Sequence, residues 1–217
     1  MNKVEEFLKN EKNHYGKIYV DLTYSIDNVS PFLDSKNLST RKYISKISVL
    51  KRYIELIEAA ESELHKKSAF SRFLNEDKYI NLLNSYKEDK SELLTQLENC
   101  SHCAYLNCTE NAFDGCLSCK SGSRIVYCDH KKINVSTHDN WTLDLTNDKT
   151  GISDRYKVLA TLQDIEKEQK YIIIVNLITD EKFILYYYPG ISEDSYGEIA
   201  DSEEFDFIVS TYQSLEE

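Results

Sequence analysis

Apolar residues in the first third of the chain recur at steps of three and four, the spacing that places them on one face of a helix. Residues 1–30 carry such a stripe, and we interpret them as a helix. The segment 17–24 also fits an alternating strand, because every second residue from Ile18 to Tyr24 is apolar. Pro31 then ends the pattern, since proline disfavours helix at the residue before it.

Two further helices are predicted before the first cysteine. Ser39 or Thr40 is a natural N-cap for a helix that reaches about Lys67. Another helix spans residues 76–99, after a short connection at 68–75. Helices joined by a short connection pack antiparallel, so the stripes predict a small helical bundle. The last stripe consists of Tyr79, Leu82, Leu83, Tyr86, Leu93, Leu94 and Leu97.

Beyond about residue 134 the apolar period falls to two, which is typical of strands. The predicted strands are 135–145, 156–162, 171–178, 182–188 and 196–199. Turn signals such as Asn147–Gly151 and Pro189–Gly190 separate them. Asp201 is a suitable N-cap for a final helix that reaches about Leu215. This part is predicted to be a small antiparallel sheet closed by a helix.

The fold class is therefore predicted to be α+β, in three parts. A helical domain or hairpin occupies 1–99, a cysteine-rich module 100–133, and an acidic β-rich domain 134–217. At 217 residues the chain is long enough to bury one or two cores.

All six cysteines lie in the central module. Cys100 and Cys103 form one CxxC pair, and Cys116 and Cys119 form a second. Each pair can direct two thiolates from one tight turn at one ion, and four thiolates are the tetrahedral set that structural zinc prefers. The spacing predicts one zinc ion here, in a stretch that looks like a zinc ribbon. Iron is the alternative metal, and disulfides or buried thiols are the alternative without a metal.

A second ligand set is also possible in the module. Cys108, Cys128 and His130 could hold another ion, with His102 or Asp114 completing the set. Two other interpretations stay open: the two cysteines could be small buried hydrophobic residues, or they could form a disulfide.

The four-thiolate site is predicted to be structural rather than catalytic. A catalytic zinc keeps an open position, which a closed set of four ligands lacks. The sequence contains no GxGxxG, P-loop, GxSxG or HExxH motif. His138 and Asp139 stand alone before Trp141, which favours a loop over a catalytic base.

The charge is unevenly distributed, although the whole chain is −11. Residues 1–99 balance 16 Lys and Arg against 16 Asp and Glu, whereas residues 136–217 carry 6 against 18. The acidic part should repel nucleic acid and anionic membranes. The N-terminus lacks an apolar signal region, so we expect a cytoplasmic protein with reduced cysteines and no membrane segment.

Basic residues nearer the module are the candidates for nucleic-acid contact. The candidate residues are Arg41, Lys42, Arg52, Lys120, Arg124, Lys131 and Lys132. The alternative is a solvated face, which is the usual role of a charge run.

The last third resembles the YrzB-like family, small acidic bacterial proteins of unknown function. The residues that carry the resemblance are YIIIVNLITDEKFILYYYPG (Tyr171–Gly190) and DSEEFDFI (Asp201–Ile208). The resemblance covers about 60 residues. It implies a small β-rich domain and assigns no activity.

Three functions remain as hypotheses. We favour a metal-binding, non-enzymatic protein that interacts with an unidentified protein partner. A nucleic-acid-associated regulator with a basic patch near the zinc module is the alternative. The third is a metal-dependent enzyme with an open site at Cys108, Cys128 and His130.

Overall fold

The structure is a computed structural model that describes residues 3–66, 76–109, 113–147 and 150–215. It is an α+β fold, as the sequence predicts. The chain divides into two compact units, Met1–His102 and Cys103–Glu217, and each is described by itself. No helix among the described residues is both long enough and apolar enough to cross a membrane.

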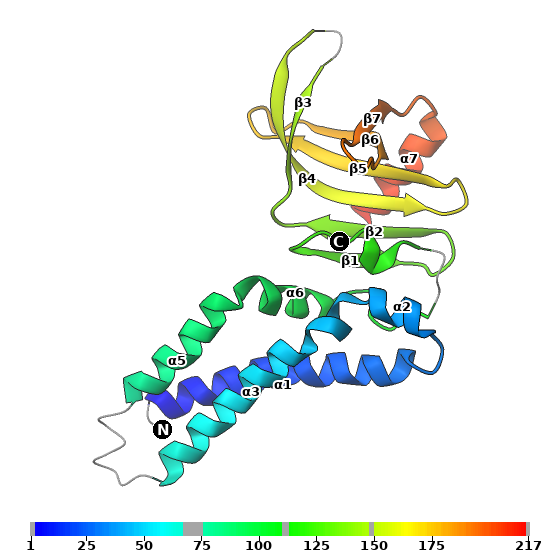
Figure 1. The fold of residues 1–217 in the computed structure, drawn as a ribbon. Helices are drawn as coiled ribbons and strands as arrows, with labels where there is room; N and C mark the ends of the chain where they lie inside the picture. Colours follow the sequence, from blue (N-terminus) through cyan, green and yellow to red (C-terminus); the bar gives the residue numbers. More distant parts are fainter. Residues whose placement is uncertain (1–2, 67–75, 110–112, 148–149, 216–217) are drawn as a thin grey trace. The chain divides into compact units, whose positions relative to one another are not determined.

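The first unit is helical (Figure 1). Its elements are α1 (Lys3–Val29), α2 (Ser35–Thr40), α3 (Lys42–Lys66), α5 (Glu76–Asp89) and α6 (Ser91–Ser101). Helix α1 packs along α3, and both contact α5 and α6. Leu8, Tyr53, Ile57 and Leu83 are fully or almost fully buried between the helices. The segment 17–24 lies inside α1, so the helical interpretation of it is confirmed.

Two boundaries differ from the predicted ones. Ser39 and Thr40 do not cap α3; they form the end of α2, and their hydroxyls donate to carbonyls three residues earlier. Asp34 caps α2 instead, by accepting the N–H of Asn37 at 2.8 Å. The predicted helix 76–99 is two helices that meet at Lys90. The predicted connection 68–75 lies outside the described residues.

The predicted stripe of the last helix also contains one error. Leu82 is half exposed, although Leu83, Leu94 and Leu97 are buried as expected. Leu83 faces the core, and Leu82, rotated from it by about 100° about the helix axis, faces more toward solvent.

The second unit is one antiparallel sheet in which seven strands are described. The strands are β1 (Ser123–Cys128), β2 (Ile133–His138), β3 (Thr142–Thr146), β4 (Ser153–Asp164), β5 (Gln169–Asn176), β6 (Lys182–Tyr188) and β7 (Ser195–Glu198). Their order is β1-β2-β4-β5-β6-β7, and β3 pairs with the N-terminal half of β4. Residues 123–128 were predicted to be part of the cysteine module, but they form the first strand of this sheet.

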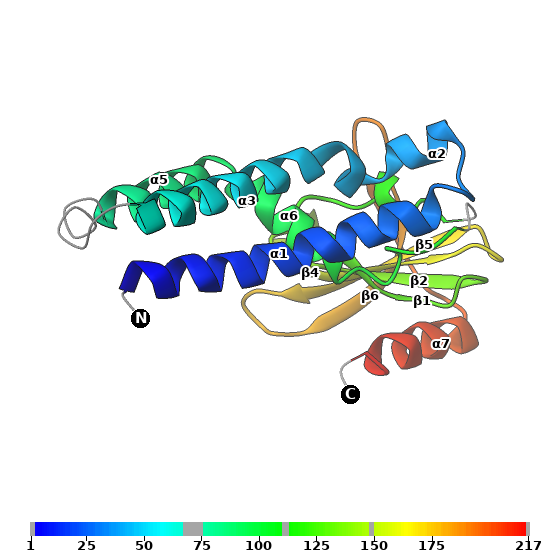
Figure 2. The same cartoon turned by 90° about the horizontal axis from the view of Figure 1, so that it is seen from below.

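Helix α7 (Ser202–Gln213) covers one face of the sheet (Figure 2). Ile208 packs there on Val135, Leu162 and Ile173. Asp201 caps α7, as predicted, by accepting the N–H groups of Glu203 and Glu204. The first turn of α7 also contacts the sheet through the Glu204 carboxylate, which accepts hydrogen bonds from the hydroxyls of Tyr171 and Tyr186.

The opposite face of the sheet carries a second apolar cluster and a set of polar side chains. Val158, Ile172, Ile174 and Tyr187 are buried there. A β-bulge in β4 between Val158 and Ala160 shifts the register, so these two residues pack in different clusters on opposite faces. The polar side chains of this face form the cavity described below.

We expect Ile173→Val to lower the free energy of unfolding of the second unit by about 1 kcal/mol, because it deletes one methylene from the core under α7. Ile178→Val is the matched control, since Ile178 is 80% exposed in the β5–β6 turn. Trp141, the only tryptophan, reports urea unfolding of this unit by fluorescence. Equal effects of the two substitutions would contradict the assignment of Ile173 to the core.

Candidate functional site

The six cysteines are all described, and all are thiols rather than disulfides. Cys100 lies in the last turn of α6 and belongs to the helical unit. It is buried, and the Gln96 side-chain amide donates to its Sγ at 3.6 Å. The other five cysteines belong to the second unit.

Cys103, Cys116 and Cys119 interact electrostatically in the second unit. The pKa of Cys103 is raised to about 11, chiefly by burial and to a smaller extent by neighbouring Cys116 and Cys119. Backbone N–H groups of Tyr105 and Ile125 act in the opposite direction, because they bond to the Cys103 sulfur. The fold therefore brings three of the four predicted zinc ligands into one neighbourhood.

The turn that carries Cys116 and Cys119 is fixed by local hydrogen bonds. Cys116 lies in a short 3₁₀ helix, Gly115–Leu117, which the Leu117 N–H closes on the Asp114 carbonyl at 2.9 Å. Cys119 comes just before β1, and its thiol donates to the Ser123 carbonyl at 3.2 Å. Cys119 of this pair thus lies next to the edge strand.

Cys108, Cys128 and His130 form a second group. His130 Nδ1 lies 3.2 Å from Cys108 Sγ and 3.9 Å from Cys128 Sγ. A hydrogen bond with Cys108 and burial both raise the pKa of the Cys128 thiol. The sequence raised this group only as a possibility, and the structure brings all three side chains together at the end of β1.

The β1–β2 turn holds His130 in place. His130 has a φ of 61°, a left-handed conformation that is uncommon for a residue other than glycine. Asp129 Oδ1 accepts the N–H groups of Lys131, Lys132 and Ile133 at 2.8–2.9 Å. Burial acts to raise the pKa of Asp129, but these three donors outweigh it and lower the pKa below its ordinary value.

The two residues suggested as completing ligands make other contacts. His102 is the exposed C-cap of α6 in the helical unit. Asp114 forms an ion pair with Lys170, and its N–H donates to Gln163 Oε1 at 3.1 Å. Within the described residues, no group of three or more His, Cys, Asp or Glu side chains stands in an arrangement that could hold a metal ion. Metal binding at either group stays a prediction.

His138 is not in a loop, as its isolation in the sequence suggested, but is the last residue of β2. Its ring is buried between two hydroxyls, with Nδ1 2.6 Å from Ser123 Oγ and Nε2 2.9 Å from Thr161 Oγ1. Burial and the nearby charge of Lys120 lower the pKa of His138 to about 4. The imidazole is therefore neutral at pH 7.

The basic residues proposed for nucleic-acid contact are divided between the units. Arg41 is buried in the helical unit and is not a surface group. Lys132, in the second unit, bonds to Glu166 at 3.1 Å and lies over the Phe207 ring.

Comparison with protein-family models, curated protein sequences and solved structures finds no match to this chain.

We expect Gly115→Ala to destabilise the second unit more than Gly151→Ala does. Both glycines have positive φ, 51° and 69°, so both substitutions carry the left-handed strain of about 1 kcal/mol. A Cβ on Gly115 would also overlap Tyr105 and lie 3.0 Å from its Cζ, whereas one on Gly151 meets nothing within 4 Å. This overlap should add about 1–3 kcal/mol. Urea titrations giving equal losses would contradict the close approach.

We expect the second unit to lose stability as the pH falls from 7 to 5, partly through His138. Its folded pKa of about 4 lies below the unfolded value of 6.5, so the unfolded chain binds the extra proton first. The contribution of neutral His138 to the free energy of unfolding is complete above pH 6.5 and is lost as the pH falls toward 4. The loss is about 2 kcal/mol at pH 5. The free energy of unfolding, measured by urea titration at several pH values, should fall less steeply between pH 7 and 5 in His138→Gln. An unchanged pH dependence would contradict the neutral, buried imidazole.

Proposed function

We propose that the chain is a zinc-binding, non-enzymatic protein that acts through contact with a protein partner. The observation that carries the metal assignment is the grouping of Cys103, Cys116 and Cys119 beside β1. Two backbone N–H groups bond to the Cys103 sulfur, an environment that suits a thiolate ligand. Burial alone penalises thiolates, and a divalent cation would offset that penalty.

Zinc is the metal that fits this donor set best. Thiolate sulfur binds zinc in tetrahedral sites, and such a site with four protein ligands serves structure rather than catalysis. The fourth ligand in this proposal is Cys100, assigned from its CxxC spacing with Cys103. Iron remains the alternative, because it accepts the same four thiolates.

A second zinc ion at Cys108, Cys128 and His130 is a further candidate. The observation in its favour is the short separation of the imidazole nitrogen from both sulfurs. Three protein ligands would leave a position for water, the arrangement of catalytic zinc. This group is therefore where the alternative function, a metal-dependent enzyme, would reside.

The proposed protein contact is supported by an open groove of about 740 Å³ on the second unit. Leu145, Phe183, Tyr196 and Phe205 are among the apolar side chains that line it. Because residues 136–217 carry 18 acidic against 6 basic residues, the partner segment should combine apolar with basic side chains. A cytoplasmic location agrees with reduced thiols.

Two other suggestions from the sequence stay proposals. Nucleic-acid binding would now rest on Lys42, Arg52, Arg124, Lys131 and Lys132, since Arg41 is buried. The resemblance of the last third to the YrzB-like family is compatible with its antiparallel sheet and terminal helix.

The zinc content of the purified, reduced protein tests the metal assignment. We expect one zinc per chain, lost in Cys116→Ser and retained in the control Ser118→Ala, which changes the same turn without removing a thiol. Loss of the ion should also destabilise the second unit, because structural zinc supplies on the order of 10 kcal/mol of binding energy.

The same measurement separates the outcomes. A Cys116→Ser protein that keeps the wild-type zinc content, or a wild-type protein without metal, would contradict the assignment. Two zinc ions per chain, one of them lost in Cys128→Ser, would add the second group and favour a test for hydrolytic activity.

A further inference from the structure

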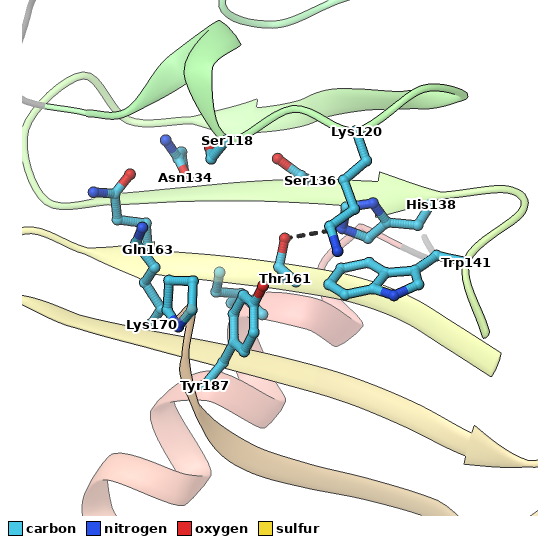
Figure 3. Close-up of a pocket in the computed structure, with 12 residues that line it drawn as sticks. Ser118, Lys120, Asn134, Ser136, His138, Trp141, Thr161, Gln163, Lys170 and Tyr187 are labelled. Carbon is cyan, nitrogen blue, oxygen red and sulfur yellow. Dashed lines mark hydrogen bonds between the residues drawn. The ribbon is translucent and has the colours of Figure 1, made fainter. Parts of the chain in front are cut away.

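A cavity of about 110 Å³ lies on the face of the sheet opposite α7 (Figure 3). Its floor is made by β2, β4 and β5, and Tyr187 of β6 forms part of one side. Ser118 and Lys120, from the turn before β1, lie along its rim. All of these residues belong to the second unit.

The floor is polar because alternate residues of neighbouring strands bring their side chains together. Asn134 is paired with Gln163 across β2 and β4, and Ser136 is paired with Thr161. Directly paired residues point to the same face of a sheet. The amides and hydroxyls can thus supply several hydrogen-bond donors within one small space.

Two lysines line the cavity, and no Asp or Glu is among its lining residues. Lys120 lies at one end with its Nζ 3.3 Å from the centre of the Trp141 ring. Lys170 lies at the other end beside Gln163. Two ammonium groups at one cavity stand out in a part of the chain that is otherwise strongly acidic.

The nearby carboxylates already have partners. Asp194 accepts hydrogen bonds from the Tyr187 hydroxyl and the Gly190 N–H, at 3.0 and 3.1 Å. Asp114 is paired with Lys170. Neither carboxylate lines the cavity, so its charged lining groups are cationic, although the Lys170 ammonium also donates to Asp114.

We propose that this cavity binds a small oxyanion, the carboxylate or phosphate group of a metabolite, between Lys120 and Lys170. The anion would accept hydrogen bonds from the ammonium groups and from the hydroxyls and amides of the floor. The volume is below the 300–1,000 Å³ typical of drug-sized ligands, so it admits one such group rather than a whole cofactor. Trp141 and Tyr187 provide apolar walls for the rest of the molecule.

Trp141 supplies the readout. It is the only tryptophan in the chain, and its ring is in contact with Lys120. An anion that draws the ammonium group away should change both the tryptophan fluorescence and the NMR shift of the indole N–H. The full-length protein, as purified, is titrated with inorganic phosphate and separately with acetate, with sodium chloride keeping the ionic strength constant.

We expect a saturable response to at least one of the two anions, with a Kd on the order of 1 mM for a bare ion. Lys120→Gln should weaken binding roughly tenfold, because it removes a charge-assisted hydrogen bond. Lys170→Gln should weaken binding less, because the Lys170 charge is already shared with Asp114. Lys182→Gln is the matched control, since Lys182 is exposed on β6 and does not line the cavity. Calorimetry measures the affinity of Lys120→Gln independently of its altered fluorescence.

Saturation by phosphate alone would identify a phosphate ligand, and saturation by acetate alone a carboxylate ligand; either supports the proposal. No saturable response to either anion would overturn it. So would an equal loss of affinity in Lys182→Gln, because that would show a general effect of charge. The test needs no added metal, so it can succeed or fail independently of the zinc assignment.

Discussion

The second unit depends on the pairing of β4, a strand of twelve residues. One side of β4 bonds to β5, while the other is shared by β2 and β3. Where β2 ends and β3 begins, the chain stays attached to β4 through the Val158 N–H, which donates to the Trp141 carbonyl at 2.9 Å. This division of one strand between two partners places Trp141 at the mouth of the cavity and sets the polar ends of β2 and β4 side by side.

The β1–β2 hairpin connects the sheet to the cysteines. Cys119 comes just before β1, Cys128 ends it, and His130 lies in the turn that follows. Ligands carried by a paired strand are positioned more precisely than ligands carried by a long loop. Both groups of thiols are thereby fixed relative to the same β1 backbone, which also donates a hydrogen bond to Cys103 through Ile125.

The sequence predicted those elements whose apolar pattern is local and regular. The strand 182–188 agrees with β6 to the residue, and the Asp201 cap is confirmed. Strand β1 was missed because Cys128 placed it within the predicted cysteine module, although Ile125 and Tyr127 alternate with other residues as strand residues do. The cavity could not be predicted, since it depends on the register of β2 with β4; the only local signal was the polar residue at every second position of β2.

The turn from Cys116 to Lys120 belongs to both proposed sites. Cys119 lies between Ser118 and Lys120, the two residues that this turn contributes to the rim of the cavity. An ion that fixes the position of Cys119 would reduce the freedom of its two neighbours, and an anion held by Lys120 would do the same for the thiol. By thermodynamic reciprocity, each ligand would then change the affinity of the other by the same factor. The occupancy of each site would then depend on the supply of both ligands, the metal and the small anion.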